Sequence, residues 1–466
     1  MIRSKEPQAQ LFYASEELYR PPRTNFYARL NRAVGSWKEL CRPLEGAFSS
    51  QRNGRPVDPA VYFKIFLVGY LEGIVFDTDL AERVADSLAV REFIGFGPTE
   101  RTPDHASLSR VRAAFAQRDL LEAVLEKTVA LCAKAGLVSG EETAVDSTLL
   151  PASASLSSLR CLKTGATVAE HMKRLKEAGE PVTARNDELR SSSDSDARIA
   201  RKGQAHPRGM YYKATLVVDA KEQVILSSLV SRADVGDSAA CRVPLTRAKA
   251  SLESQGLALG RVVGDAGYDD TDLHAFVEEL GSEPLTNYVD ASGGKPQGFG
   301  KKDFVYDEAR NVFRCPAGKN LKPSGGVYGG KRTYYAKEKD CRGCPFAKEC
   351  LGKVTAKRRT VHRHVHERCR ERNIARCHTE EGRAALKRRK TVAEPPFAHM
   401  KRLGGLHKLN CRGLGKADVK GKVAAIAWNL LKLASRLDPQ KTLRALWRRW
   451  KAEVPLPPTR PRLVGV

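Results

Sequence analysis

Two aspartates stand alone in apolar, strand-like segments of the sequence. Asp265 follows residues 262–264, a short apolar run that predicts a buried strand ending in a tight turn. Asp146 lies in a similar segment, residues 143–150, among small and apolar side chains. Burial of an aspartate in such a segment costs free energy unless the carboxylate is paired or bound to a metal ion. The ordinary alternative is an aspartate at a strand end that accepts hydrogen bonds from backbone amides.

A third acid, Glu394, stands in a strongly basic stretch and is followed by two prolines. Because proline fits only the first turn of a helix, we expect a helix to start near residues 392–395 and to end at residues 404–405. Lys401 lies seven residues after Glu394, which is nearly two turns, so both side chains share one face. Taken alone, Glu394 is equally well explained as an acid that the helix dipole favours.

Carboxylates supply the hard oxygen ligands that Mg2+ prefers. Strand ends are also where α/β sheets bind ligands, so Asp265 is well placed for chemistry. A pair of ions about 3.5–4 Å apart serves phosphodiester cleavage and transfer, because it neutralises charge on the attacking and leaving oxygens. The three acids are far apart along the chain, so only a folded sheet can unite them.

Four cysteines form a second candidate metal site. Cys341 and Cys344 make a Cys-x2-Cys pair, with Cys315 before it and Cys350 after it. Four thiolates suit a closed tetrahedral Zn2+ site, and neighbouring glycines and prolines allow the turns that aim the sulfurs. We expect one structural Zn2+ here, because the stretch has too few apolar residues to fold without it. The alternative is a set of four reduced, half-buried thiols.

The charge of the chain indicates its partner. The 466 residues carry 80 Lys and Arg against 54 Asp and Glu, which gives a formal net charge of +26. Solubilising surfaces usually mix the two signs more evenly, so this excess favours nucleic acid as a polyanionic partner.

The N-terminus is polar, so we expect no signal peptide. The most apolar run, residues 61–76, carries Lys64 and Glu72 and is too short to span a bilayer comfortably. We therefore expect a cytoplasmic, nucleoid-associated protein with no membrane partner. Its eleven cysteines should be reduced or metal-bound.

The strand and helix patterns around these residues indicate an α/β fold. Strand patterns at residues 143–150, 211–219, 224–230, 262–264 and 285–289 alternate with helical ones, including residues 237–254 and 269–280, which fits a mixed sheet flanked by helices. We expect five parts: residues 1–135 (helical), 140–310 (sheet, with a polar, partly mobile insertion at 151–209 that carries a helix near 168–178), 311–380 (cysteine-rich), 381–440 and 441–466 (basic tail).

The N-terminal part predicts a set of helices, one of them over residues 80–93. Residues 102–112 predict a turn and a short helix that carries Arg110 and Arg112. A basic helix after a tight turn is typical of a helix-turn-helix DNA-binding domain. An ordinary helical bundle with solvated arginines is the simpler explanation of this segment taken alone.

Together these motifs resemble a bacterial insertion-sequence transposase of the DDE class. Residues 145–148 resemble its first-aspartate strand, residues 264–268 its second-aspartate motif, and Glu394 with Lys401 the Glu-x6-Lys part of its third motif. The cysteine block resembles an insertion seen in one branch of the family. The match extends to the N-terminal helices, so it covers most of the chain.

The third motif departs from the family pattern at three positions. Lys387 and Lys390 stand where the family has a tyrosine and an arginine, although Arg389 is adjacent, and Ala398 replaces the usual glycine.

The resemblance implies a ribonuclease-H-like catalytic core, with an N-terminal all-helical domain and a small zinc-binding insertion. It implies that Asp146, Asp265 and Glu394 hold two Mg2+ ions, with Mn2+ as a substitute, and that the partner is DNA: the element's terminal inverted repeats and target DNA. We expect a homodimer or higher assembly on that DNA.

The DNA contacts expected from the resemblance are basic. Lys401, with Lys390 and Arg389, should contact the phosphate backbone, and Arg110 and Arg112 should read the element's ends. Two other functions fit the sequence: a domesticated, non-cleaving DNA-binding derivative, and a metal-dependent nuclease without strand transfer.

Overall fold

The computed structural model describes residues 25–47, 58–116, 120–179, 187–201, 203, 207–288, 298–351, 356–402 and 404–437. The chain divides into two compact units, and unit 2 is inserted into the sequence of unit 1. Unit 1 comprises residues 1–236, 243–258 and 391–466, and unit 2 comprises residues 237–242 and 259–390. The predicted basic tail, residues 441–466, lies outside the described residues.

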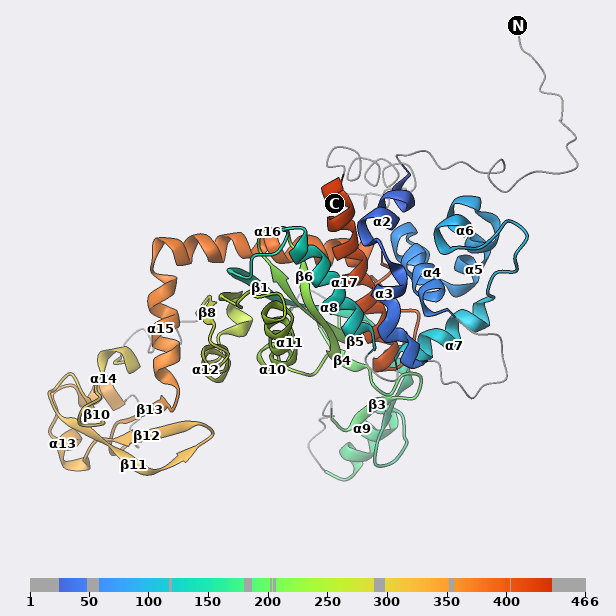
Figure 1. The fold of residues 1–466 in the computed structure, drawn as a ribbon. Coiled ribbons are helices and arrows are strands. Elements are labelled where there is room, and N and C mark those ends of the chain that lie inside the picture. Colours follow the sequence, from blue (N-terminus) through green and yellow to red (C-terminus); the bar gives the residue numbers. More distant parts are fainter. Residues whose placement is uncertain are drawn as a thin grey trace, which may run out of the picture. The chain divides into compact units, whose positions relative to one another are not determined.

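Helices open unit 1, as predicted (Figure 1). The predicted single helix over residues 80–93 is wrong, because Ser87 ends one helix and caps the next with its Oγ, which accepts a hydrogen bond of 3.4 Å from Val90 N. The described elements here are α2 (Phe26–Val34), α3 (Trp37–Cys41), η1 (Arg42–Ala47), α4 (Pro59–Glu72), α5 (Asp77–Asp86), α6 (Leu88–Ile94), α7 (His105–Phe115) and α8 (Leu120–Lys134).

Helix α4 is the buried centre of this helical region. Asp58 caps it, Pro59 occupies its first turn, and Phe63 and Leu67 are fully buried. Among the described residues, no single helix is long and apolar enough to cross a membrane; only the bent pair of α4 and α5 passes on length and composition.

A sheet forms the centre of unit 1. Strand β5 (Gly209–Asp219) pairs antiparallel with β1 (Glu142–Pro151), β4 (Arg198–Ala200) and β6 (Ile225–Arg232), and β5 and β6 match the strands predicted at residues 211–219 and 224–230. Helix α17 (Leu414–Leu437) packs on β6 and on α8, and α11 (Arg242–Glu253) adds further buried residues to the unit. The buried residues of these strands and helices form the core of the unit.

The described part of the polar insertion is folded onto helix α17. It contains η2 (Leu156–Ser158), the paired strands β2 (Leu159–Cys161) and β3 (Leu189–Ser191), and α9 (Val168–Glu177), a helix that the sequence predicts. Asp194 Oδ1 accepts a hydrogen bond of 3.2 Å from Gly413 N, and Asp196 Oδ2 accepts one of 2.9 Å from Leu414 N. These carboxylates satisfy amides at the start of α17.

Unit 2 begins with α10 (Asp237–Ala240), β7 (Arg261–Gly264), η3 (Ala266–Tyr268), α12 (Thr271–Glu279) and β8 (Glu283–Thr286), and β7 and β8 are parallel. The single helix predicted from residue 237 to 254 is wrong. Pro244 has no amide hydrogen to bond Ala240 O, so the helix breaks at Cys241 into α10 and α11. The predicted strand over residues 285–289 ends at Thr286, and residue 289 lies outside the described part.

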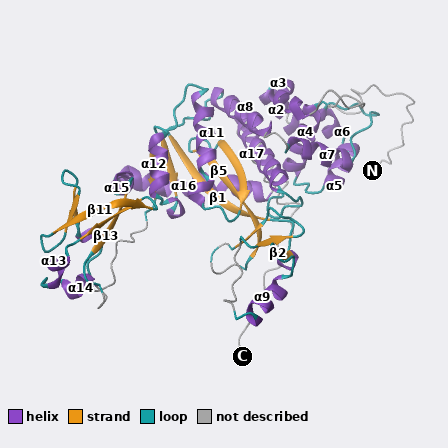
Figure 2. Ribbon diagram, turned by 90° about the horizontal axis from the view of Figure 1, so that it is seen from below, coloured by secondary structure: helices purple, strands orange, loops and turns teal. Residues whose placement is uncertain are grey.

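The cysteine-rich part of unit 2 forms its own sheet (Figure 2). The strands, in the spatial order β13-β12-β11-β10-β9, are all antiparallel. Their bounds, with those of the helices beside them, are η4 (Lys301–Asp303), β9 (Val305–Asp307), β10 (Val312–Arg314), β11 (Asn320–Tyr328), β12 (Lys331–Tyr335), α13 (Glu338–Arg342), α14 (Ala347–Leu351), β13 (Thr360–His364) and α15 (Glu367–Cys377).

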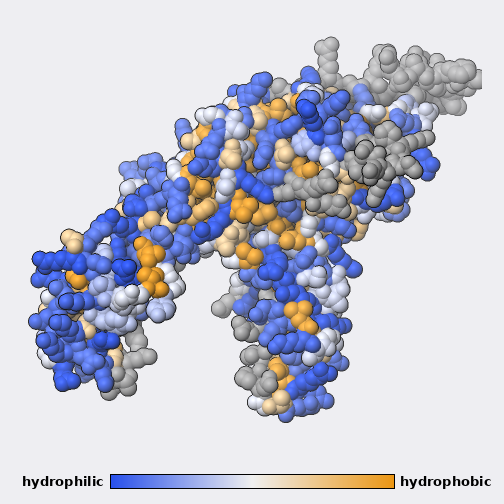
Figure 3. All heavy atoms as spheres, turned by 60° about the horizontal axis from the view of Figure 1, so that its bottom comes forward, coloured by the Kyte–Doolittle hydropathy of each residue, from blue (hydrophilic) through white to orange (hydrophobic). Residues whose placement is uncertain are grey.

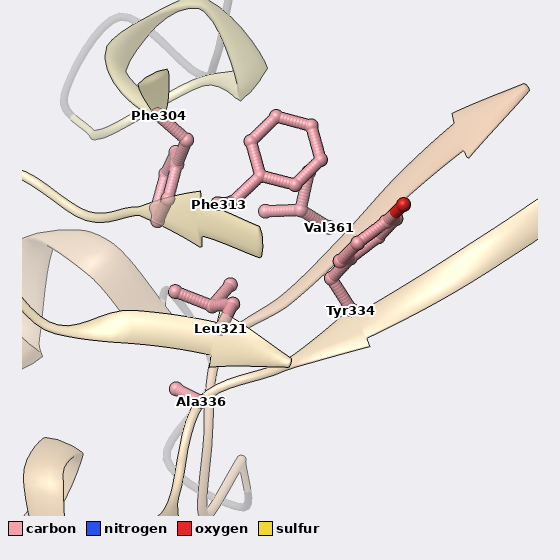
Figure 4. Close-up of a cluster of buried hydrophobic side chains, with 6 residues drawn as sticks. All are labelled: Phe304, Phe313, Leu321, Tyr334, Ala336 and Val361. Atoms are coloured by element: carbon pink, nitrogen blue, oxygen red, sulfur yellow. The ribbon is translucent and has the colours of Figure 1, made fainter. Parts of the chain in front are cut away.

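This sheet encloses an apolar cluster of its own. The cluster consists of Phe304, Phe313, Leu321, Tyr334, Ala336 and Val361 (Figure 4). This stretch therefore has more apolar contact than its sequence suggests, because six side chains that are scattered along the chain meet in one core.

The predicted start of a helix near residues 392–395 is wrong, because helix α16 (Glu380–Arg402) contains these residues in its interior. It begins fourteen residues before Glu394 and carries Pro395 and Pro396 in its interior. Pro395 cannot bond the Thr391 carbonyl, but Gln223 Nε2 donates to that oxygen at 3.0 Å. Trp428 Nε1 in turn donates to Gln223 O at 2.6 Å. A side chain distant in sequence thus replaces the missing donor.

Candidate active site

Asp146 lies in the middle of β1, opposite Leu216 of β5. Strand β1 is rich in small and β-branched residues such as Val145 and Thr148, which favour an extended backbone. Asp146 Oδ1 accepts a hydrogen bond of 2.8 Å from Ser147 N, and Ser147 Oγ bonds Thr215 Oγ1 at 2.8 Å. The side chain of Asp146 is half-buried. The predicted isolated acid is thus held on a rigid strand of unit 1.

Glu394 and Lys401 both lie in the part of α16 that belongs to unit 1. Glu394 is exposed, whereas Lys401 is half-buried. Lys401 Nζ donates to Thr148 Oγ1 at 2.5 Å. Thr148 stands two residues after Asp146, and alternate residues of a strand face the same side. The structure therefore brings the third motif onto the strand of the first.

A half-buried histidine lies near the same end of α16. His399 Nδ1 and Tyr70 Oη lie 2.9 Å apart in a hydrogen bond, and the His399 ring meets the Trp428 ring edge-on at 5.1 Å. Burial, with a smaller contribution from the Lys432 charge, lowers the pKa of His399 to about 4. His399 is therefore a neutral packing residue that fixes the helix of Glu394 against α4 and α17.

Asp265 lies in unit 2, directly after β7. It caps η3, and its Oδ1 accepts a hydrogen bond of 2.9 Å from Gly267 N. Gly264 permits this turn, because a β-carbon there would stand 2.9 Å from Tyr268 Cβ. Tyr268, 1% exposed, locks the turn into the core. The prediction of a carboxylate where strand becomes loop is confirmed.

A second carboxylate faces the Asp265 turn. A β-carbon on Gly267 would lie 3.0 Å from Asp265 Oδ1 and 3.3 Å from Asp237 Oδ2. Asp237 is the first residue of α10 and is half-buried. The sequence indicates Asp237 only as a helix-start acid, and its place beside Asp265 follows from the folded turn alone.

The basic residues differ in their surroundings. Lys390 is exposed, but Arg389 is only 8% exposed and lies largely inside the fold. On α7, Arg110 is exposed and donates to Ser107 Oγ at 3.0 Å. Arg112 instead pairs with Asp77 at 2.6 Å and covers the Phe66 ring at 4.7 Å. Lys390 and Arg110 are therefore exposed, whereas Arg389 and Arg112 are engaged in contacts within the fold. Contact with DNA by Lys390 or Arg110 would break no core contact.

All four predicted zinc ligands line one pocket in unit 2. Cys315 follows β10, Cys341 and Cys350 lie on α13 and α14, and Cys344 lies between these helices. Lys319 N donates to Cys315 Sγ at 3.3 Å. Burial raises the pKa of Cys350, the nearby thiols raise it further, and Arg359 lowers it. Four soft donors around one pocket match the donor set of a structural Zn2+.

Within the ranges that the structure describes, no group of three or more His, Cys, Asp or Glu side chains is arranged so that it could hold a metal ion. Asp146 and Glu394 belong to unit 1, whereas Asp265 belongs to unit 2. Both metal centres remain predictions.

Two ranges of the chain match known protein families. Residues 15–114 match a transposase domain, DUF772, and residues 314–434 match the transposase DDE domain. The second range includes Glu394, Lys401 and the cysteine quartet. The predicted resemblance to a DDE transposase is confirmed: the chain carries transposase domains of this class. Their presence also indicates a DNA-processing enzyme.

One similar solved structure is the cryo-EM structure of piggyBac transposase in a synaptic complex with hairpin DNA. The likeness has a TM-score of 0.36 and 10% sequence identity, and it covers 93% of this chain and 83% of that chain. The comparison with curated proteins gives no match.

Proposed function

We propose that this protein is a DDE transposase that cuts the ends of its insertion sequence and joins them to target DNA. The hydrogen bond between Lys401 and Thr148 carries the proposal, because it attaches the helix of Glu394 to the strand of Asp146. A net charge of +26 suits a DNA partner, whose phosphates supply much of the binding energy.

We assign the catalytic carboxylates to Asp146, Asp265 and Glu394, in a ribonuclease-H-like core. A bound pair of Mg2+ or Mn2+ ions would supply charge neutralisation on the attacking and leaving oxygens. In end cleavage, a water oxygen forms a bond to phosphorus and the 3′-oxygen leaves with a proton. In joining, the freed 3′-hydroxyl attacks a target phosphodiester, and the 3′-oxygen of the target leaves. Lys401 holds a phosphate oxygen beside β1.

We assign recognition of the element's ends to the N-terminal helices, with Arg110 at the DNA. Lys390 adds a phosphate contact, whereas Arg112 and Arg389 support the fold around these contacts. The enzyme works as a homodimer or higher assembly on DNA in the cytoplasm. We further assign one structural Zn2+ to Cys315, Cys341, Cys344 and Cys350, where it would fix α13 and α14 to the sheet.

The test uses the purified full chain, a plasmid that carries the element's ends, and Mg2+. Asp265→Ala should bind the ends but lose cleavage by several orders of magnitude, since removal of a metal ligand removes stabilisation of the transition state. Asp272→Ala, an exposed acid of α12, is the matched control. Wild-type products joined to target DNA would support transfer, whereas cleavage alone would indicate a nuclease. Cleavage retained by Asp265→Ala would contradict the proposal.

A further inference from the structure

The five-stranded sheet of unit 2 has two different faces. One face carries the apolar cluster that includes Tyr334 and Val361, against which Cys341 of α13 and Cys350 of α14 also pack. Neighbouring residues of a strand point to opposite faces, so the residues on either side of Tyr334 and Val361 belong to the other face.

The strand register defines this second face, which we call the outer face. Lys322 of β11 pairs with Tyr335 of β12, and Tyr335 pairs in turn with Thr360 of β13. The same alternation continues along the three strands to the end of the β11–β12 hairpin. The outer face therefore includes Lys322, Tyr328, Lys331, Thr333, Tyr335 and His362.

The outer face is positively charged. Strands β11, β12 and β13 contain no Asp or Glu. Lys322, Lys331 and His362 are exposed. Arg358 is exposed as well, and its guanidinium lies over the Tyr335 ring at 4.3 Å, a cation–π contact that adds a third strong cation to this face.

One acid borders the outer face. Asp272 Oδ2 lies 3.6 Å from His364 Nε2, and His364 pairs with Lys331 in the sheet. Within the described ranges, neither Lys322 nor Lys331 forms an ion pair. Like charges on one surface repel each other, and a bound polyanion offsets that repulsion.

The β11–β12 hairpin extends the outer face (Figure 1). Gly329 and Gly330 have φ angles of 55° and 71°, the left-handed conformation that a tight two-residue hairpin turn requires. Tyr328, directly before the turn, is 86% exposed, and Lys331 follows the turn directly. The hairpin thus presents an exposed aromatic ring and a cation at its tip.

We propose that the outer face is a second DNA-binding surface, which holds the phosphates of duplex DNA. The identity of the polyanion rests on the proposed function. The surface lies in unit 2, whereas the N-terminal helices, to which recognition of the element's ends is assigned, belong to unit 1. Lysine and arginine contacts to phosphates fix the position of DNA without reading its bases, so binding here is independent of sequence.

Two features favour duplex DNA over a single strand. The major groove of B-DNA admits a two-stranded β-ribbon, so the β11–β12 hairpin can enter it with Lys331 near the backbone. Single-stranded DNA is held instead by bases that stack on open aromatic rings. Arg358 covers one side of the Tyr335 ring, and that side cannot stack on an unpaired base.

The experiment measures binding of the purified full chain to a duplex of random sequence by fluorescence anisotropy over a range of salt concentrations. The triple variant Lys322→Gln, Lys331→Gln, Arg358→Gln should weaken binding roughly 10- to 100-fold and lower the salt slope by about three, because each phosphate contact contributes about one to the slope.

The matched control removes the same charge from elements beside the apolar cluster. It is the triple variant Lys302→Gln, Lys339→Gln, Lys348→Gln, of three exposed lysines in η4, α13 and α14, and it should bind as wild type does. Circular dichroism melts check that each variant is folded.

Arg358 packs on an aromatic ring, so its replacement affects packing as well as charge. If the outer-face triple variant does not fold, the double variant Lys322→Gln, Lys331→Gln decides the matter, with a loss of about two in the salt slope.

The outcomes separate this inference from the proposed function. Wild-type binding in the outer-face variant, or an equal loss in the control, would overturn the inference, and cleavage of the element's ends by the wild type would leave the transposase proposal standing. Binding lost only in the outer-face variant, with no cleavage by the wild type, would support the surface and contradict the proposed function. Tighter binding of the wild type to a single strand than to the duplex, lost in the outer-face variant, would overturn the assignment to duplex DNA.

Discussion

The ammonium group of Lys401 donates a hydrogen bond to the hydroxyl of Thr148, across 253 residues of sequence. It joins the C-terminal half of α16 to β1 within one unit. A lysine held at this place can donate a charge-assisted hydrogen bond to a phosphate oxygen.

The first prediction concerns this contact. Lys401→Gln should weaken binding to the element's end DNA and reduce the salt slope of binding by about one, because one phosphate contact is lost. Lys408→Gln, an exposed lysine nearby in sequence, is the control. Fluorescence anisotropy over a range of salt concentrations measures both. An unchanged slope in Lys401→Gln would show that this lysine does not touch DNA.

The second prediction concerns zinc. The purified protein should contain one Zn2+, and Cys341→Ser should lose it, while Cys369→Ser, outside the pocket, should keep it. Because the neighbouring sheet has its own apolar cluster, metal removal should lower the unfolding temperature without unfolding the protein. Elemental analysis and thiol titration are the measurements. Protein without zinc whose four pocket thiols all react freely would refute the site.

The third prediction concerns the prolines in α16. Gln223→Leu removes the donor to Thr391 O and should destabilise the protein by about 1 kcal/mol, the usual cost of an unmade hydrogen bond near the surface. Gln255→Leu, an exposed glutamine on another segment, is the control. Urea unfolding compares the two variants. Equal stability would mean that α16 does not depend on the Gln223 side chain.

The fourth prediction concerns a buried cation. Lys422, 1% exposed, pairs with Asp418 at 2.8 Å and with Glu122 at 3.2 Å. Lys422→Met should destabilise unit 1 by about 3 kcal/mol, because it removes the charge that offsets two largely buried acids. Lys416→Met on the same helix should cost far less. Chemical unfolding distinguishes them, and similar values for both variants would refute a stabilising role for the buried pair.

The fifth prediction concerns pH. The pKa of His399 falls from 6.5 to about 4 in the fold, so the unfolded chain takes up a proton at a higher pH than the folded chain does. The contribution of His399 is therefore complete above pH 6.5 and is lost as the pH falls towards 4, by about 2–3 kcal/mol. His399→Leu should show a flatter dependence over this range than wild type, whereas His407→Leu, which is exposed, should follow wild type. Parallel pH profiles of wild type and His399→Leu would contradict this.

Sequence periodicity and turn residues predicted the elements of the fold that depend on short-range sequence. The strands of Asp146 and Asp265, strands β5 and β6, and helices α9 and α12 follow from periodicity and turn residues. The start of α16 could not be predicted in this way. Its prolines are tolerated because Gln223, 168 positions before Thr391, supplies the missing hydrogen bond. Likewise, no spacing in the sequence places Asp237 beside Asp265, since their approach depends on how a turn and a short helix pack.

Composition was a poor guide to the core of the cysteine-rich stretch. The cysteine-rich stretch looks poor in apolar residues because its six core side chains are spread over nearly sixty positions and meet only through antiparallel pairing. On the face of the molecule drawn in Figure 3, hydrophilic residues predominate over the hydrophobic ones. Position in the sequence predicted that Lys401 shares a face with Glu394, but its partner Thr148 is a tertiary contact.

Helix α17, the last described element of unit 1, packs against α2, α4, α7, α8, β5 and β6, and its start is bonded by Asp194 and Asp196. Most elements of unit 1 therefore cannot complete their packing until residues 414–437 have been synthesised. During synthesis, a ribosome must complete the whole inserted unit 2 before this helix emerges. Contacts of such large sequence separation fold slowly. The nascent N-terminal helices thus spend most of translation with apolar faces uncovered, and the yield of folded enzyme should depend on chaperones that cover those faces until α17 arrives.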